Sequence, residues 1–186
     1  MRKITTFINI TLDGFCNHEA MMADEELHEH ANDYFRGGDT IIFGRKTYQL
    51  MEDAWPAIAK NPTGVKATDE FAVLMDNISK IVFSHTLKKL QWETARLAQY
   101  DLETTVKELK QQTGKNILVG GTTLISSLLE LGLIDEIRLL IQPIVLGNGV
   151  ALFRDIKERV DLKLLETKTL HSGVVIHYYE PTNRRK

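Results

Sequence analysis

The sequence contains a single cysteine among its 186 residues, and it lacks any long run of apolar side chains. Cys16 therefore cannot form a disulfide within the chain or join other cysteines in a zinc site, and it fits a reducing compartment. The first residues lack the continuous apolar core of a signal peptide, and no apolar run is long enough to span a bilayer. We therefore expect a cytoplasmic protein without a membrane partner.

An excess of either charge is also absent, because 23 Lys and Arg face 25 Asp and Glu for a formal net charge of −2. This balance gives no electrostatic reason to expect nucleic acid or an anionic membrane as a partner. The hydrophobic fraction of 43% and the charged fraction of 26% are typical of globular proteins. A chain of this length can bury a sizeable core, and we expect a single domain over residues 1–186.

The most informative stretch runs from Asn116 to Gly132. Ile117-Leu118-Val119 is typical of a strand buried on both faces, and Gly120-Gly121 permits a sharp turn because neither residue carries a Cβ. We expect Thr122 and Thr123 to cap the helix that follows. Free N–H groups and the positive end of the helix dipole would then point over the turn and favour a phosphate. A Gly-Gly turn also occurs as a plain connection, so this signal is weak by itself.

Hydrophobic periodicity predicts an alternation of strands and helices along the whole chain. We expect strands over residues 4–12, 39–43, 80–83, 95–99, 117–119, 136–144, 162–170 and 174–179. We expect helices over residues 24–35, 45–51, 69–75, 102–109 and 122–131, with an irregular connection over 54–68. The last two strands face each other across His171-Ser172-Gly173 as a hairpin. This order indicates an α/β fold with a mixed, mostly parallel sheet flanked by helices and closed by a C-terminal antiparallel hairpin.

Three of the predicted strands end in similar polar segments, namely Gly44-Arg45-Lys46-Thr47, Ser84-His85-Thr86 and Gly120-Gly121-Thr122-Thr123. Each is rich in glycine, hydroxyl groups or cations, and none contains an acid. Open α/β sheets bind ligands beyond the carboxyl ends of their strands, so we expect a polyanionic nucleotide here. A ribose without a 2′-phosphate often pairs with an acid at such a strand end, whereas a 2′-phosphate favours cations. The missing acid, together with Lys88 and Lys89, favours NADPH over NADH.

Six ordered motifs resemble the dihydrofolate reductase-like superfamily. They are Thr11-Leu-Asp-Gly-Phe15, Ile42-Phe-Gly-Arg-Lys-Thr-Tyr48, Ile81-Val-Phe-Ser-His-Thr86, Leu118-Val-Gly-Gly-Thr-Thr-Leu124, Leu133-Ile-Asp-Glu136 and Pro143-Ile-Val-Leu-Gly-Asn-Gly149. The resemblance covers nearly the whole chain. It looks closest to the branch that contains the C-terminal reductase domain of the bifunctional riboflavin-biosynthesis deaminase/reductase.

This resemblance implies that NADPH binds across the strand ends. Its phosphates would be held at one end by Gly44, Arg45, Lys46 and Thr47, and its adenosine 2′-phosphate would lie near Ser84, His85 and Thr86. The pyrophosphate would lie on Gly120, Gly121, Thr122, Thr123 and Leu124, and the segment from Thr11 to Gly14 would open a mobile loop beside the nicotinamide. Together with the apolar late strands, the resemblance also suggests a homodimer built around Leu139, Ile141 and residues 174–176.

The catalytic acid is the point at which this chain departs from the family pattern. Dihydrofolate reductases use one carboxylate on the first helix to contact the pterin and assist its protonation. The corresponding place here falls near His28, and Asp24 lies one turn earlier on the same face. We assign the acid to Asp24, although a charged first turn that stabilises the helix dipole explains it equally well. His28-Glu29-His30 suggests no metal site, because residues two apart point to different sides of a helix.

The sequence therefore predicts an NADPH-dependent reductase that transfers a hydride to a planar heterocyclic substrate. One alternative is the pyrimidine reductase of riboflavin biosynthesis, whose substrate carries a ribose phosphate. A fused zinc deaminase is not expected, because the chain lacks a Pro-Cys-x-x-Cys motif. The other alternative is a nucleotide-binding protein that has kept the cofactor cleft and lost the chemistry.

Overall fold

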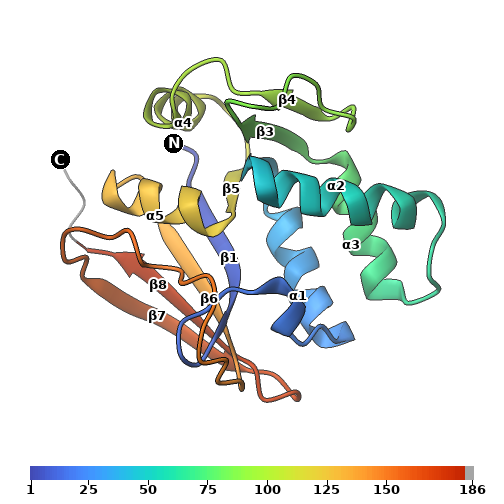
Figure 1. Cartoon of the computed structure of the whole chain (residues 1–186), viewed down its shortest axis with the longest axis vertical. Coiled ribbons are helices and arrows are strands. Elements are labelled where there is room, and N and C mark those ends of the chain that lie inside the picture. The colour runs from blue at the N-terminus through green and yellow to red at the C-terminus, as the bar shows by residue number, and fades with distance from the viewer. Residues whose placement is uncertain (183–186) are drawn as a thin grey trace.

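One eight-stranded sheet with the order β4-β3-β2-β5-β1-β6-β8-β7 runs through the molecule (Figure 1). The computed structural model describes residues 1–182. The strands are β1 (Ile4–Thr11), β2 (Gly38–Gly44), β3 (Ser79–Phe83), β4 (Ala95–Leu97), β5 (Asn116–Gly120), β6 (Glu136–Gln142), β7 (Leu162–Thr169) and β8 (Val175–Pro181). The helices are α1 (Glu25–Arg36), α2 (Arg45–Lys60), α3 (Lys66–Asn77), α4 (Leu102–Gln111) and α5 (Thr122–Glu130), and His18–Ala20 forms a 3-10 turn.

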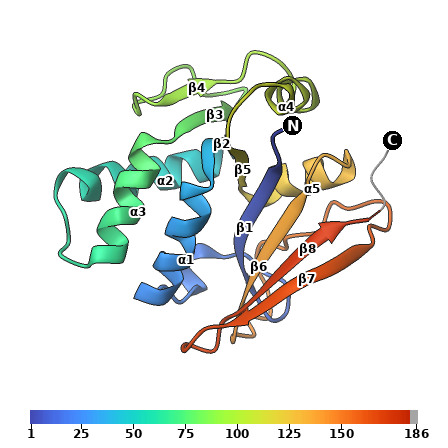
Figure 2. The same ribbon diagram turned by 180° about the vertical axis from the view of Figure 1, so that it is seen from behind.

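The six strands from β4 to β6 are mutually parallel, and β8 and β7 follow as an antiparallel pair. Figures 1 and 2 show the β7–β8 hairpin at one edge of the sheet and β4 at the other. The predicted fold class, a mostly parallel sheet with a C-terminal hairpin, is thus confirmed.

Helices cover both faces of the sheet. Ile117 and Val119 of β5 pack in one core cluster with α4 and α5, whereas Leu118 between them packs in a second cluster with α1, α2 and α3. Consecutive strand side chains point to opposite faces, so both faces must be covered to bury all three. The apolar run of β5 is therefore a strand buried on both sides, as the sequence predicted.

The connection over residues 54–68 is helical for most of its length, so the prediction of an irregular segment is wrong. Helix α2 continues past Pro56 to Lys60, and α3 already begins at Lys66. A proline removes one main-chain hydrogen bond, which need not end a helix that packs well. Trp55 packs edge-on against Phe71 of α3, with ring centroids 4.5 Å apart. Contact between the two helices therefore outweighs the local stop signal of Trp55-Pro56.

The apolar residues that suggested a dimer contact belong largely to the core of the chain itself. Leu139, Val174 and Ile176 are 8%, 0% and 0% exposed, and Ile141 packs partly buried against the same core. The three buried side chains are therefore not free to contact a second chain, whereas Ile141 is only partly buried. In the part of the chain that the structure describes, no helix is both long and apolar enough to cross a bilayer.

Candidate active site

The three polar segments predicted from the sequence lie side by side at the carboxyl ends of the parallel strands. Their strands β3, β2 and β5 are neighbours, and Gly44 is in register with Phe83 while Phe43 is in register with Gly120. Because these strands are parallel, the segments that follow them leave the sheet side by side. The structure thus brings together Gly44, Ser84 and Gly120 with the residues that follow each, although these three residues are 36 or more positions apart in the sequence.

The turn from β5 into α5 passes very close to the start of α2. Gly121 has a φ of 98°, a conformation that other residues rarely adopt. A Cβ on Gly121 would lie 2.5 Å from Oγ1 of Thr47, and a Cβ on Gly120 would lie 2.5 Å from the Phe43 ring. Both glycines are therefore required by the contact between two strand ends.

Gly121 is also the N-cap of α5, so the prediction that Thr122 and Thr123 cap this helix is wrong. They are its first two helical residues, and the N-cap Gly121 has no side chain that could accept a hydrogen bond from the first turn. The left-handed turn places the glycine where a capping serine or threonine would otherwise stand. The N–H groups of this first turn consequently remain available to an anion.

A cavity of about 170 Å³ opens beside this first turn. It is lined by Lys46 of α2, by Thr122, Thr123 and Ser126 of α5, and by Val150, Ala151, Leu152, Arg154 and Asp155 of the loop after β6. The sequence pattern did not predict that Ser126 and this loop would lie here, because their approach depends on the topology. A larger cavity of about 250 Å³ between α1 and α3 has a mixed lining of three acids, Glu29, Asp33 and Glu70, and two cations, Arg36 and Lys66.

The remaining predicted cofactor residues differ in what they can offer a ligand. Arg45 and Lys46 are exposed, as are His85 and Thr86 after β3. The Ser84 hydroxyl oxygen accepts hydrogen bonds from the N–H groups of Thr86 and Leu87, at 3.2 and 3.0 Å, which fixes this turn. Leu124, in contrast, is buried in the core, so only its main chain can face a ligand.

The loops that follow β1 and β6 are tied to each other beside the cavity. Asp13 accepts hydrogen bonds from the N–H groups of Gly147, at 2.7 Å, and Leu146, at 3.1 Å. Its bond from the Thr11 hydroxyl and these main-chain contacts lower the pKa of the Asp13 carboxyl to about 2. Asn17 similarly accepts from the N–H of Val150 at 2.8 Å. The segment predicted to open a mobile loop is therefore joined to a second loop.

Asp24, the predicted acid, is the N-cap of α1. Its Oδ1 accepts a hydrogen bond from the N–H of Leu27 at 2.7 Å. The main-chain oxygen of Asp24 lies 3.0 Å from Nδ1 of His28. A carbonyl oxygen only accepts, so Nδ1 of His28 carries the hydrogen and Nε2 is the acceptor nitrogen in the neutral ring. The helix-capping role weighed from the sequence is thus present, and it leaves Oδ2 of Asp24 outside the cap.

A mostly parallel sheet that ends in an antiparallel hairpin, with polar, glycine-containing strand ends, is the arrangement of the dihydrofolate reductase-like class. The chain belongs to the RibD C-terminal domain family, whose model matches residues 2–176. It is 36% identical over 178 residues to the uncharacterized protein YyaP of Bacillus subtilis, covering 94% of this chain and 92% of that protein. YwjB, an uncharacterized protein of the same organism, is 26% identical over 184 residues, covering 95% and 97%.

Solved structures agree with this assignment at the level of the fold. A putative riboflavin biosynthesis protein from Shewanella sp. PV-4 has a TM-score of 0.69 at 17% identity, covering 97% of this chain and 99% of that one. RibD of Acinetobacter baumannii has a TM-score of 0.74 at 18% identity, covering 98% of this chain and 58% of that one. The family resemblance inferred from the sequence motifs is therefore confirmed, and the chain is an oxidoreductase of the reductase-domain type.

Proposed function

We propose that residues 1–186 form a single NADPH-dependent reductase domain acting on a planar heterocycle, with a pyrimidine of riboflavin biosynthesis as the leading substrate. The observation that carries the proposal is the position of three acid-free segments at the ends of adjacent parallel strands, two of which line one cavity. Family membership favours the pyrimidine over dihydrofolate. A ribose phosphate on that substrate would also suit the three strand-end segments, none of which contains an acid.

The residues at the strand ends fit a dinucleotide. Gly121 leaves no room for a side chain beside Thr47, and the uncapped first turn of α5 can donate N–H groups to a diphosphate. Lys46 supplies a cation to the same cavity. The exposed turn at His85, with Lys88 close by in the sequence, would bind the 2′-phosphate. NADPH supplies the hydride when bound, and the protein supplies orientation, proton delivery and exclusion of water.

Titration of NADPH and NADH by calorimetry tests the cofactor assignment. We expect NADPH to bind about tenfold to a hundredfold more tightly, since one charge-assisted phosphate contact is worth roughly 1.5–3 kcal/mol. Lys88→Ala should weaken NADPH and leave NADH unchanged. Equal affinities in the wild type would contradict the 2′-phosphate site, and failure to bind either nucleotide would contradict the function itself.

NADPH oxidation with a ribosylaminopyrimidine phosphate, and separately with dihydrofolate, then tests the substrate. Turnover of the pyrimidine alone supports the leading substrate assignment. Turnover of dihydrofolate alone would contradict it and identify dihydrofolate as the substrate. Tight NADPH binding without oxidation in either assay favours the second candidate function, a nucleotide-binding protein without chemistry. That candidate rests on Asp24, whose carboxylate already serves as a helix cap.

We also propose that the protein is a homodimer in the reducing cytoplasm, which a single cysteine suits. Leu139, Val174 and Ile176, which the sequence suggested for the interface, are buried. The outer strand β7 is therefore the better surface, with Leu164 and Leu165 at 51% and 46% exposure. Sedimentation at micromolar concentration should show a dimer that Leu165→Glu converts to a monomer. Val73→Glu on α3, where the side chain is 47% exposed, is the matched control. A wild-type monomer would refute this assembly.

A further inference from the structure

The loop after β6 brings a second cation to the cavity at α5. Arg154 lines this cavity together with Lys46, Thr122 and Thr123. Lys46 belongs to the first turn of α2, whereas Arg154 arrives from a loop more than 100 residues later. Two cations from unrelated segments therefore meet the uncapped first turn of α5 at one small cavity.

The present partner of Arg154 holds it only weakly. Its Nε lies 3.2 Å from Oδ2 of Asp155, and the two side chains are 66% and 59% exposed. Ion pairs with this exposure contribute little to stability, so the guanidinium can leave Asp155 at little energetic cost. A phosphate offers it shorter, bidentate hydrogen bonds, for which the planar guanidinium is well shaped.

The main chain that carries Arg154 is fixed on the cavity wall. Leu152, two residues earlier, is 1% exposed, and its carbonyl oxygen accepts a hydrogen bond of 2.6 Å from the buried hydroxyl of Ser126 in α5. Ala151 forms an antiparallel bridge with Phe15. Because α5 itself anchors the loop, Arg154 starts at a defined place relative to the first turn of that helix.

We propose that Arg154 binds the diphosphate of the dinucleotide, so that the loop after β6 forms part of the cofactor site. The inference rests on the proposed function and adds a binding residue to it. Asp155, which lines the same cavity, would lose its ion pair with Arg154 when the nucleotide binds. The diphosphate is common to NADPH and NADH, so Arg154 contributes to affinity without choosing between the two nucleotides.

Calorimetric titration of Arg154→Ala with NADPH, NADH and inorganic pyrophosphate tests this role. We expect NADPH and NADH affinities to fall by the same factor, about tenfold to a hundredfold, since both lose one charge-assisted contact. Pyrophosphate binding should weaken in parallel, and Arg154→Lys should restore part of each affinity. The thermal unfolding temperature should stay unchanged, because the side chain is 66% exposed.

Arg159→Ala is the matched control, since this arginine lies in the same loop with its side chain 86% exposed and does not line the cavity. It should leave all three affinities unchanged. Wild-type affinities in Arg154→Ala would overturn the inference and leave the proposed function standing. A loss confined to NADPH would overturn it too, because Arg154 would then bind the 2′-phosphate. If the wild type bound neither nucleotide, the proposed function and the inference would both fall.

Discussion

Asp24 joins a structural role to a proposed chemical one at a single position. Its Oδ1 caps α1 through the N–H of Leu27, and its main-chain oxygen accepts from His28. His28 in turn lies edge-on to Trp55 and Phe71, with ring centroids 6.2 and 5.8 Å away. A carboxylate that caps a helix cannot be tested by alanine alone, because alanine removes the cap and the acid together.

Asp24→Asn separates the two roles. Asparagine caps helices about as well as aspartate, so we expect the unfolding free energy and the NADPH affinity to change little. Turnover should fall by about 10²–10⁴-fold, the usual contribution of a positioned acid or base, and most at high pH where protons from solvent are scarce. Steady-state kinetics across pH and chemical denaturation give the two readouts. Full activity would transfer the proton role to His28 or to water.

Lys80 shows what sequence patterns cannot reveal about a single residue. The pattern correctly places it in a strand, yet its side chain is 0% exposed. Its Nζ donates to Thr94 Oγ1 at 2.7 Å and lies 3.9 Å from the centre of the Trp92 ring. Burial lowers the pKa of the Lys80 ammonium to about 8. Nothing in a single strand indicates that partners 12 to 14 positions later will enclose a charge there.

At the scale of elements, two loops at the carboxyl ends of the strands form one structural unit. The loop after β1 and the loop after β6 share the Asp13 contacts, a main-chain hydrogen bond from Cys16 to Val150 and the bridge between Phe15 and Ala151. One wall of the cavity belongs to the second loop. The position of that wall consequently depends on residues at the far end of the sequence.

Asp13→Ala should make the loop after β6, which forms this cavity wall, more mobile. We expect the amides of Leu146 and Gly147 to exchange hydrogen at least tenfold faster and NADPH affinity to fall several-fold. Since contacts in the fold lower the pKa of Asp13, they stabilise the loops above the ordinary carboxyl pKa and are lost as pH falls towards 2. Hydrogen exchange followed by mass spectrometry measures the effect.

Asp101→Ala is the control for this change. Asp101 is an exposed aspartate whose pKa is also lowered, first by a hydrogen bond from the Thr104 N–H, but it caps α4 away from the cavity. Its removal should speed exchange in α4 alone. Unchanged exchange at Gly147 in Asp13→Ala would show that the two loops are held together without this carboxylate.

For the whole molecule, the sequence predicted the order of elements because each apolar run is long enough to specify its own type. It predicted the three strand ends because parallel topology places them at a common edge. The extent of α2, the N-cap at Gly121 and the cavity wall were not predicted. Each depends on contacts between distant segments, such as that of Asp13 with Gly147, 134 positions apart.

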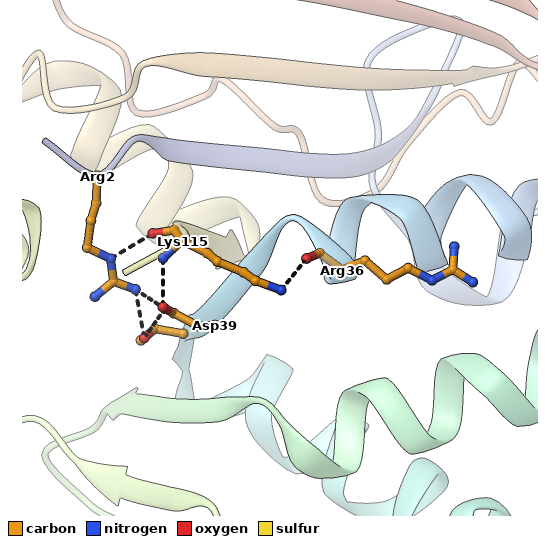
Figure 3. Close-up of polar contacts among 5 residues, drawn as sticks. Arg2, Arg36, Asp39 and Lys115 are labelled. Carbon is orange, nitrogen blue, oxygen red and sulfur yellow. Dashed lines mark hydrogen bonds and ion pairs between the residues drawn. The ribbon is translucent and has the colours of Figure 1, made fainter. Parts of the chain in front are cut away.

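The amino ends of the strands carry a polar cluster that does not line the cavity at α5 (Figure 3). The Arg2 side chain is 4% exposed, forms an ion pair with Asp39 and donates from Nε to the Lys115 carbonyl at 2.7 Å. Lys115 donates its N–H to Asp39 at 2.8 Å and its Nζ to the Arg36 carbonyl at the end of α1 at 3.0 Å. The starts of β1, β2 and β5 are thus joined at the end of the sheet opposite the candidate site.

The polar cluster lies at the amino ends of the strands and the candidate site at their carboxyl ends. We therefore expect that stability and cofactor binding can be changed independently. Arg2→Leu leaves Asp39 without its cation and the Lys115 carbonyl without a donor, so we expect the unfolding free energy to fall by about 2–4 kcal/mol. This range begins lower than the one for fully buried pairs, because the Asp39 side chain is 39% exposed. Arg36→Leu, which removes more exposed ion pairs, should cost less than about 1 kcal/mol.

Both variants should bind NADPH like the wild type at temperatures where they are folded, because neither residue lies at the carboxyl ends of the strands. Chemical denaturation and calorimetry give the two quantities, and a weaker NADPH affinity in folded Arg2→Leu would show that the two ends of the strands are coupled through the sheet.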